Sequence, residues 1–270
     1  MSSILSNLKK FYKGFIYLIF RYLFFKKYIH IKCDLLNAEF NCFIEDVIGR
    51  HLFKYGSHER DNSNFLLRNF SLKENEIALD IGANLGWYSV LLNRISSSKS
   101  KIYSFEPDEK NFYLLKNNLT LNHCTNVFPV NKAISNENGT SDFYKYPSKN
   151  SGRHSLIPAI GLEKCNVETI ILDDFLKDNE LSRVKFLKID IEGYEYFALS
   201  GASKVLKQDI LIMMEYSPRL YTESCSAEKL KKLLYDNSFK PYVLNQASLK
   251  QISGDNLDEV DDQIDVFWKK

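Results

Sequence analysis

Residues 76–86 read EIALDIGANLG and carry the strongest structural signal in the chain. The apolar run 76–81 predicts a short strand, and residues 87–95 predict a helix behind it. Gly82, in the turn between them, allows the backbone to approach a ligand closely. The first turn of the helix offers unbonded N–H groups to an anion such as a carboxylate. Asp80, at the tip of the strand, is placed to bind a ligand amine directly or through water.

Strands and helices alternate on both sides of this turn. Residues 63–70, 108–122, 194–206 and 227–236 have helical spacing, with a break at Ser200–Gly201. Short apolar runs predict strands at 101–105, 126–130, 140–146, 184–189, 210–215, 240–244 and 264–268, and residues 147–164 predict a loop. This alternation predicts an α/β fold with a mostly parallel sheet. The last two strands, with no helix evident between them, predict an antiparallel hairpin at its edge.

Composition narrows the possible functions. The chain has 270 residues, of which 44% are hydrophobic and 26% charged, as in an ordinary globular protein. Its formal net charge of +2 lacks the basic excess of a nucleic-acid binder. Five cysteines without a CxxC pair predict neither a disulfide framework nor a zinc site, so a reducing cytoplasm is the simplest location.

The turn predicts a cofactor site. Glu106 closes the second strand of the unit, where an acid accepts hydrogen bonds from two ribose hydroxyls. A dinucleotide site, as in a nicotinamide-dependent oxidoreductase, would show GxGxxG. Here Gly82 and Gly86 are separated by three residues, and Asp80 would repel a pyrophosphate. S-adenosylmethionine, which carries an ammonium, a carboxylate and a ribose, fits better. The simpler alternative is that the two glycines only form a tight turn.

Three motifs together resemble the FkbM family of S-adenosylmethionine-dependent methyltransferases. They are LDIGANLGWYS at 79–89, YSFEPDEKNFYLLKNN at 103–118 and FLKIDIEGYEYFALSGA at 186–202. LIMMEYS at 211–217 matches the next strand of the family, and the similarity covers residues 56–216. It implies a class I methyltransferase fold, with a mostly parallel seven-stranded sheet between helices on both faces. It also implies that the methionine part of the cofactor is lined by Asp80, Gly82, Ala83, Asn84 and Gly86, that Glu106 holds the ribose, and that Asn131 lies near the adenine.

Acidic residues follow the later strands, where the site of an open α/β sheet lies. We expect Asp190, Glu192 and the loop residue His154 to act in catalysis, with Glu215 as a further candidate. Asp190 and Glu192 would otherwise stabilise the start of a helix, and His154 would be a solvated loop residue. The three acids could also gather a divalent cation, although their spacing does not require a metal.

The amino-terminal stretch is aromatic and basic. Residues 11–28 read FYKGFIYLIFRYLFFKKY, and residues 1–33 carry seven basic side chains and no acid. The run is too short and too charged for a spanning helix. It suits a helix lying on an anionic membrane surface, or one packing on the domain or on a second copy in a homo-oligomer. We therefore expect an extension over 1–55 and a methyltransferase domain over 56–270.

The leading functional hypothesis is a cytoplasmic O-methyltransferase, working near the inner membrane face on a sugar or glycan intermediate of a surface polysaccharide. This substrate class follows from the resemblance, because family members mostly methylate hydroxyls of sugars or natural products. The alternatives are a methyltransferase for a small non-sugar molecule and a non-catalytic module that only binds the cofactor.

Overall fold

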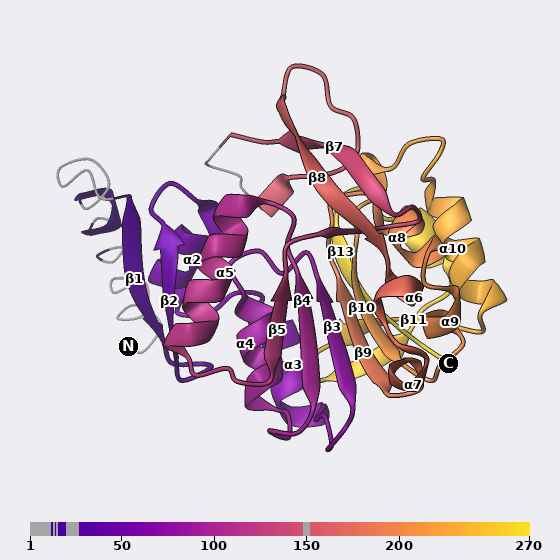
Figure 1. The fold of residues 1–270 in the computed structure, drawn as a ribbon, viewed down its shortest axis with the longest axis horizontal. Coiled ribbons are helices and arrows are strands. Elements are labelled where there is room, and N and C mark those ends of the chain that lie inside the picture. Colours follow the sequence, from indigo (N-terminus) through magenta and orange to yellow (C-terminus); the bar gives the residue numbers. More distant parts are fainter. Residues whose placement is uncertain (1–11, 13, 15, 20–26, 148–151) are drawn as a thin grey trace.

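A computed structural model describes residues 12, 14, 16–19, 27–147 and 152–270 (Figure 1). Its centre is an eight-stranded sheet in the order β12-β11-β13-β10-β9-β3-β4-β5. Its strands, in chain order, are β3 (Ile77–Ile81), β4 (Lys101–Phe105), β5 (Val127–Val130), β9 (Val184–Ile189), β10 (Leu211–Tyr216), β11 (Lys240–Asn245), β12 (Ser248–Gln251) and β13 (Ile264–Lys269).

The predicted α/β class with a mostly parallel sheet is confirmed. The five strands from β10 to β5 run parallel, and β13 pairs antiparallel with both β10 and β11. The family resemblance implied a seven-stranded sheet, and β12 is an eighth strand, paired antiparallel with β11 at the edge. β11 and β13 pair as predicted, but β12 and the short helix α11 (Gly254–Asp258) lie between them in sequence.

Helices cover both faces of the sheet because its central strands are apolar on both sides. All five residues of β3 are buried, and alternate residues enter different cores. Ala78 belongs to the core beneath α3 (Arg60–Asn69), α4 (Trp87–Arg94) and α5 (Glu109–Leu121). Ile77 and Leu79 belong to the core beneath α8 (Glu195–Ser200), α9 (Ser203–Leu206) and α10 (Ala227–Asp236). The predicted break at Ser200–Gly201 separates α8 from α9.

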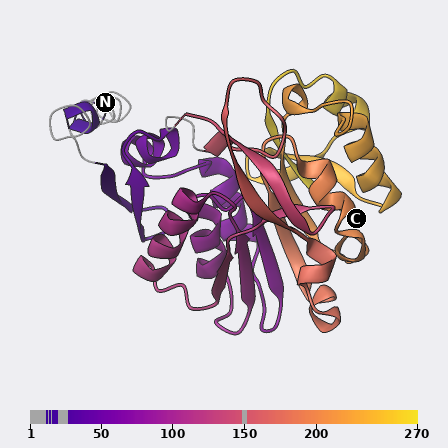
Figure 2. The same cartoon turned by 45° about the horizontal axis from the view of Figure 1, so that its top comes forward.

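A second, three-stranded sheet stands above the central one, as Figures 1 and 2 show. Its order is β6-β8-β7, with β6 at Ala133–Ser135, β7 at Gly139–Lys145 and β8 at Glu163–Ile171. The predicted loop over 147–164 therefore ends where β8 begins. Two single-turn helices, α6 (Leu172–Phe175) and α7 (Asp178–Leu181), lead from β8 into β9, and the 3₁₀ turn η2 (Pro218–Leu220) follows β10.

The amino-terminal part contains a β-hairpin and a helix that join the main fold. β1 (Tyr28–Cys33) pairs with β2 (Ala38–Phe43), and α2 (Val47–Tyr55) follows. On α5, the side chain of Asn118 accepts from the amide of Asn41 at 2.8 Å, and that of Asn122 accepts from the amide of Glu39 at 2.9 Å. Apolar residues of the hairpin belong to the same core as α4 and α5. The predicted boundary between 55 and 56 therefore does not separate two cores.

Most of the aromatic stretch 11–28 lies outside the described residues. Within it, Tyr17 is buried, packs on Phe53 with 5.5 Å between ring centroids, and donates a hydrogen bond to the carbonyl of Ile44. This contact supports packing on the domain for Tyr17. Among the described residues, no helix is both long enough and apolar enough to cross a membrane.

Candidate active site

A cavity of about 390 Å³ opens where the parallel strands end. One part of its lining is the loop after β3 together with Glu106. Another part comes from the segment after β9 and from the end of β10. The cavity brings together eight of the residues selected from the sequence: Gly82, Ala83, Asn84, Glu106, His154, Asp190, Glu192 and Glu215. It does not reach three others, Asp80, Gly86 and Asn131.

Gly82 and Gly86 are required by packing within the protein. Gly82 has φ +79°, and a Cβ built on it would lie 1.9 Å from the carbonyl oxygen of Asp190. Gly86 has φ +96°, and its Cβ would lie 2.8 Å from a methyl carbon of Leu115 on α5. The backbone after β9 fills the space beside Gly82, and the predicted approach of the Gly82 backbone to a ligand stays a prediction.

Asp80 lies buried in the protein next to the loop after β3. Its side chain is fully buried, and one oxygen accepts a hydrogen bond from Ser89 Oγ at 2.6 Å. Burial raises the pKa of Asp80, although the nearby Lys188 ammonium opposes the shift. Asp80 is not part of the cavity lining, and its predicted contact with a ligand amine, directly or through water, stays a prediction. Its other oxygen has no hydrogen-bond partner among the described residues.

Glu106 is fixed at the end of β4 by two backbone amides. The amides of Asn84 and Asp108 donate to its two carboxylate oxygens at 2.8 and 2.9 Å. Burial raises the pKa of Glu106 to about 8 against the opposing effect of these bonds. Each oxygen keeps a lone pair for a ligand hydroxyl, so the geometry suits the predicted ribose contact.

Asn131 does not take the position expected of an adenine neighbour. Its amide donates to the carbonyls of Glu106 and Pro107 at 2.8 and 3.1 Å, away from the cavity lining. The chain enters the cavity one residue later, at Lys132 and Ala133. Asn131 therefore holds the end of β4 in place.

We expect Glu106→Ala to weaken binding of S-adenosylhomocysteine at least tenfold. The variant loses two hydrogen bonds from the ribose hydroxyls, each worth about 0.5–1.5 kcal/mol to a neutral carboxyl and about 1.5–3 kcal/mol to an ionised one. Isothermal titration calorimetry measures the effect, with the exposed Glu109→Ala on α5 as the matched control. A change below twofold in a folded Glu106→Ala protein would contradict the assignment.

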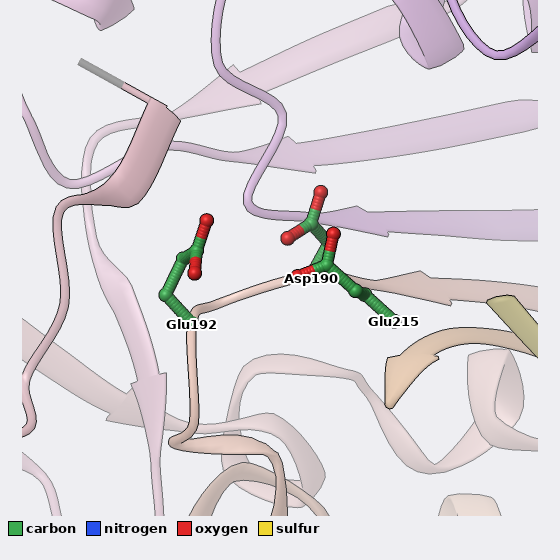
Figure 3. Close-up of side chains that lie close together, drawn as sticks. All are labelled: Asp190, Glu192 and Glu215. Atoms are coloured by element: carbon green, nitrogen blue, oxygen red, sulfur yellow. The ribbon is translucent and has the colours of Figure 1, made fainter. Parts of the chain in front are cut away.

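Three carboxylates converge across the cavity from Glu106. Asp190 and Glu192 follow β9, Glu215 lies on β10, and each offers an oxygen within 4.8 Å of the others (Figure 3). The Lys188 ammonium lies 3.1 Å from Asp190 Oδ2 and donates to the carbonyl of Gly82 at 3.2 Å. Lys188 thus ties the acidic cluster to the loop after β3.

The acidic cluster retains protons at neutral pH. Burial, and then the charge of Asp190, raises the pKa of Glu192 to about 8. Burial, with the charges of Asp190 and Glu192, raises the pKa of Glu215 to about 10. Glu215 is also held by hydrogen bonds from Ser217 at 3.0 Å and Gln263 at 2.8 Å. Such an arrangement offers both donors and acceptors to the hydroxyls of a ligand. Three clustered carboxylates also suit a divalent cation, which stays a prediction.

The Glu192 carboxyl is expected to make the protein less stable as pH rises. The folded chain keeps a proton up to a pKa of about 8, whereas the unfolded chain releases it near 4.5. This contribution to stability is complete below pH 4.5 and is lost as pH rises through 8. Glu192→Gln, which cannot ionise, should therefore be about 1–3 kcal/mol more stable than wild type above pH 8. Urea unfolding at pH 5 and 8.5 measures this. Equal pH slopes for wild type and variant would contradict it, and Glu163→Gln on exposed β8 is the control.

His154 lines the cavity but has the wrong tautomer for a base. Its Nδ1 accepts a hydrogen bond from the amide of Tyr146 at 3.0 Å, so the neutral ring carries its proton on Nε2. Burial lowers the pKa of His154. The ring is therefore a hydrogen-bond donor near neutral pH, and the predicted catalytic role as a base is not supported.

The sequence analysis missed three other cavity residues, His58, Glu59 and Lys188. Lys188 could have been found, because it interrupts the apolar strand run at a position that should be buried. His58 and Glu59 lie before α3 in no recognisable pattern, and only the fold brings them to the cavity.

The residues present fit S-adenosylmethionine. Glu106 keeps acceptors for a ribose, and α4 begins without a side-chain cap, so its first amides remain available to a carboxylate. The charge of Asp190, which raises the pKa of its neighbours Glu192 and Glu215, complements a sulfonium, which is positively charged. One cavity therefore contains features suited to the ribose, the carboxylate and the sulfonium of the cofactor.

Comparisons with known proteins agree with this assignment. Residues 80–241 match the family model described as Methyltransferase FkbM domain. Hexuronic acid methyltransferase AglP from Haloferax volcanii is 26% identical over 175 residues, which cover 62% of this chain and 70% of that protein. Methyltransferase sdnD from Sordaria araneosa is 28% identical over 165 residues, covering 50% of this chain and 63% of that protein.

Solved structures are similar at lower identity. The crystal structure of methyltransferase FkbM from Methylobacillus flagellatus KT gives a TM-score of 0.47 at 15% identity, covering 81% of this chain and 52% of that one. This chain therefore spans about half the length of that protein.

Proposed function

Because the chain belongs to the FkbM family of methyltransferases, we propose that it methylates a hydroxyl group of a sugar or glycan intermediate. It is an S-adenosylmethionine-dependent methyltransferase with the class I fold. The sugar acceptor is supported by the similarity to a hexuronic acid methyltransferase. The observation that carries the proposal is the convergence of Asp190, Glu192 and Glu215 in the cavity that also contains Glu106.

The acidic cluster would bind and align the acceptor. A sugar presents several hydroxyls, and carboxylates are the side chains that accept hydrogen bonds from two of them at once. The cofactor supplies an electrophilic methyl group on a sulfonium. Glu106 fixes the ribose, while Asp190 and Glu192 hold the acceptor hydroxyl in line with that methyl group, which is the main requirement of such a displacement.

Transfer of labelled methyl groups tests this function. The full chain is incubated with methyl-labelled S-adenosylmethionine and with neutral hexoses, the matching hexuronic acids, nucleotide sugars, a cell-envelope extract, small non-sugar alcohols and bulk protein. Label in any sugar or glycan supports the proposal. Label only in protein or in a non-sugar compound would overturn the sugar assignment and leave the methyltransferase assignment intact.

We further propose that the enzyme works in the cytoplasm at the inner membrane face, on a precursor of a surface polysaccharide. The support is the sequence of residues 11–28, where lysine and arginine are interspersed among aromatic side chains. Each basic residue near an anionic leaflet contributes about 1 kcal/mol. Flotation of the full chain with anionic vesicles at low salt tests the proposal, compared with a chain lacking residues 1–26. If the full chain does not float, the membrane proposal is wrong.

A further inference from the structure

His58 and Glu59 form an ion pair on the wall of the cavity, outside the residues matched to the family model. His58 Nε2 lies 3.1 Å from Glu59 Oε1, and each side chain is only 23% exposed. The hydroxyl of Tyr88 donates to the other oxygen of Glu59 at 2.5 Å. Glu59 is thus fixed from two sides, and it fixes His58 in turn.

The backbone of the pair is also held in place. The carbonyl of His58 accepts from Ser63 Oγ at 2.9 Å, and Ser63 accepts from Trp87 Nε1 at 2.9 Å. The His58 ring stands edge-on to Trp87, with 6.3 Å between centroids. Glu59 has φ +40°, a left-handed conformation that is costly for a residue with a side chain and that is often found at functional sites.

The hydrogen bond decides which nitrogen of His58 carries the proton. Nε2 donates to Glu59, so Nδ1 of the neutral ring keeps its lone pair. Nδ1 has no hydrogen-bond partner among the residues that the structure describes. His58 therefore has the tautomer of a proton acceptor, the opposite of His154.

The charged groups around His58 make its ring a stronger base. Burial lowers its pKa, but the hydrogen bond and charge of Glu59, helped by Asp190, outweigh burial and the opposing Lys188 and leave it raised. Glu59 itself stays ionised, because His58, Lys188 and Tyr88 lower its pKa to about 2 against burial. The charged or titratable groups that face the pair come from α2, α4, β9, the segment after β9, and β13. They are His51, Tyr88, Lys188, Asp190 and Asp265.

We propose that His58 is the general base that deprotonates the acceptor hydroxyl, and that Glu59 is its positioning residue. This inference rests on the proposed function. The acceptor proton passes to His58 Nδ1 while the acceptor oxygen forms a bond to the methyl carbon. The carbon–sulfur bond breaks, and its electron pair stays on sulfur as the neutral thioether. The imidazolium, stabilised by Glu59, then releases its proton to water.

The acidic cluster is less suited to this role. With pKa values of about 8 and 10, Glu192 and Glu215 already hold protons at neutral pH. Asp190 is engaged by the Lys188 ammonium. These residues bind hydroxyls, whereas the lone pair of His58 remains available.

Histidine NMR on the full chain tests the pair without any cofactor. In ¹⁵N-labelled protein, the pKa of the His58 ring should lie above that of an ordinary histidine. When the ring is neutral, Nδ1 should be unprotonated and Nε2 protonated. Glu59→Gln should lower its titration midpoint. His58→Gln assigns the signal. A neutral ring protonated on Nδ1, or a midpoint that Glu59→Gln does not move, would overturn the inference.

Kinetics test the role in catalysis. His58→Gln should lower kcat on the order of 10²–10⁴-fold. In the pH profile of kcat/KM it should also remove the acidic limb, which is the fall in kcat/KM at low pH. The affinity for S-adenosylhomocysteine should change less than threefold. Glu59→Gln should move that limb to lower pH. His30→Gln, on the exposed hairpin, is the matched control.

The possible failures are distinguishable. If His58→Gln keeps kcat within threefold, or loses only cofactor affinity, His58 is not the base. If the wild-type chain methylates no sugar, the proposed function itself is wrong, which is seen before any variant is made.

Discussion

Asp190→Asn is expected to lower kcat/KM for methyl transfer on the order of 10³-fold. The acidic cluster depends on Asp190, because its charge is held beside Lys188 and raises the pKa of both Glu192 and Glu215. Asparagine keeps the shape of the side chain but removes this charge. The number of protons that Glu192 and Glu215 hold at a given pH therefore changes. Steady-state transfer of labelled methyl groups measures the loss.

Cofactor binding separates this effect from unfolding. Asparagine still offers an oxygen to Lys188, so S-adenosylhomocysteine should bind with less than a threefold change in affinity. Asp236→Asn, which makes the same change on exposed α10, should keep full activity. A variant at Asp190 that retains more than a tenth of wild-type kcat/KM would show that the cluster does not act through this carboxylate.

Gly82→Ala is expected to have the largest effect on stability. The added methyl group would lie 1.9 Å from the carbonyl oxygen of Asp190, so β3 and the segment after β9 would have to separate. The residue also has φ +79°, which disfavours any side chain. We expect a loss above about 3 kcal/mol, as for other substitutions that break a close backbone packing, measured by urea unfolding.

Gly56→Ala is the matched control. Gly56 has a similar φ of +69°, but nothing lies within 4 Å of the position of its Cβ. Its substitution should cost only about 1–2 kcal/mol, the price of the left-handed conformation alone. Equal losses at the two glycines would mean that the contact with Asp190 contributes nothing.

The sequence predicts the central sheet because its strands are short apolar runs bounded by glycine, proline and polar residues. It does not predict β8, because polar residues such as Glu163, Lys164 and Asn166 break the apolar pattern there. The hairpin β1–β2 was missed although its residues alternate between buried and exposed. The aromatic stretch before it dominates the local composition.

The candidate site was predictable where position in the fold determines the role. Glu106, Asp190 and Glu192 follow strands and reach the cavity as expected. For other polar residues, the role depends on the hydrogen-bond partner of the side chain, and that partner lies on another element of the fold. Asp80 is engaged by Ser89, and Asn131 by the end of β4. His58 gains its role only through neighbours on α4 and β9, which no local pattern reveals.

The position of β13 also sets an order for folding. β13 follows β11 in sequence, yet it lies between β10 and β11 in the sheet. During synthesis, which proceeds from the amino end, the β11–β12 hairpin must wait undocked until β13 has emerged. Until then β10 is an unpaired edge, open to pairing with another chain. Gln263 and Asp265, which bond to Glu215 and Asn62, arrive with β13. A nascent chain therefore contains Glu106 and the loop after β3 long before the hydrogen bond from Gln263 to Glu215 can form.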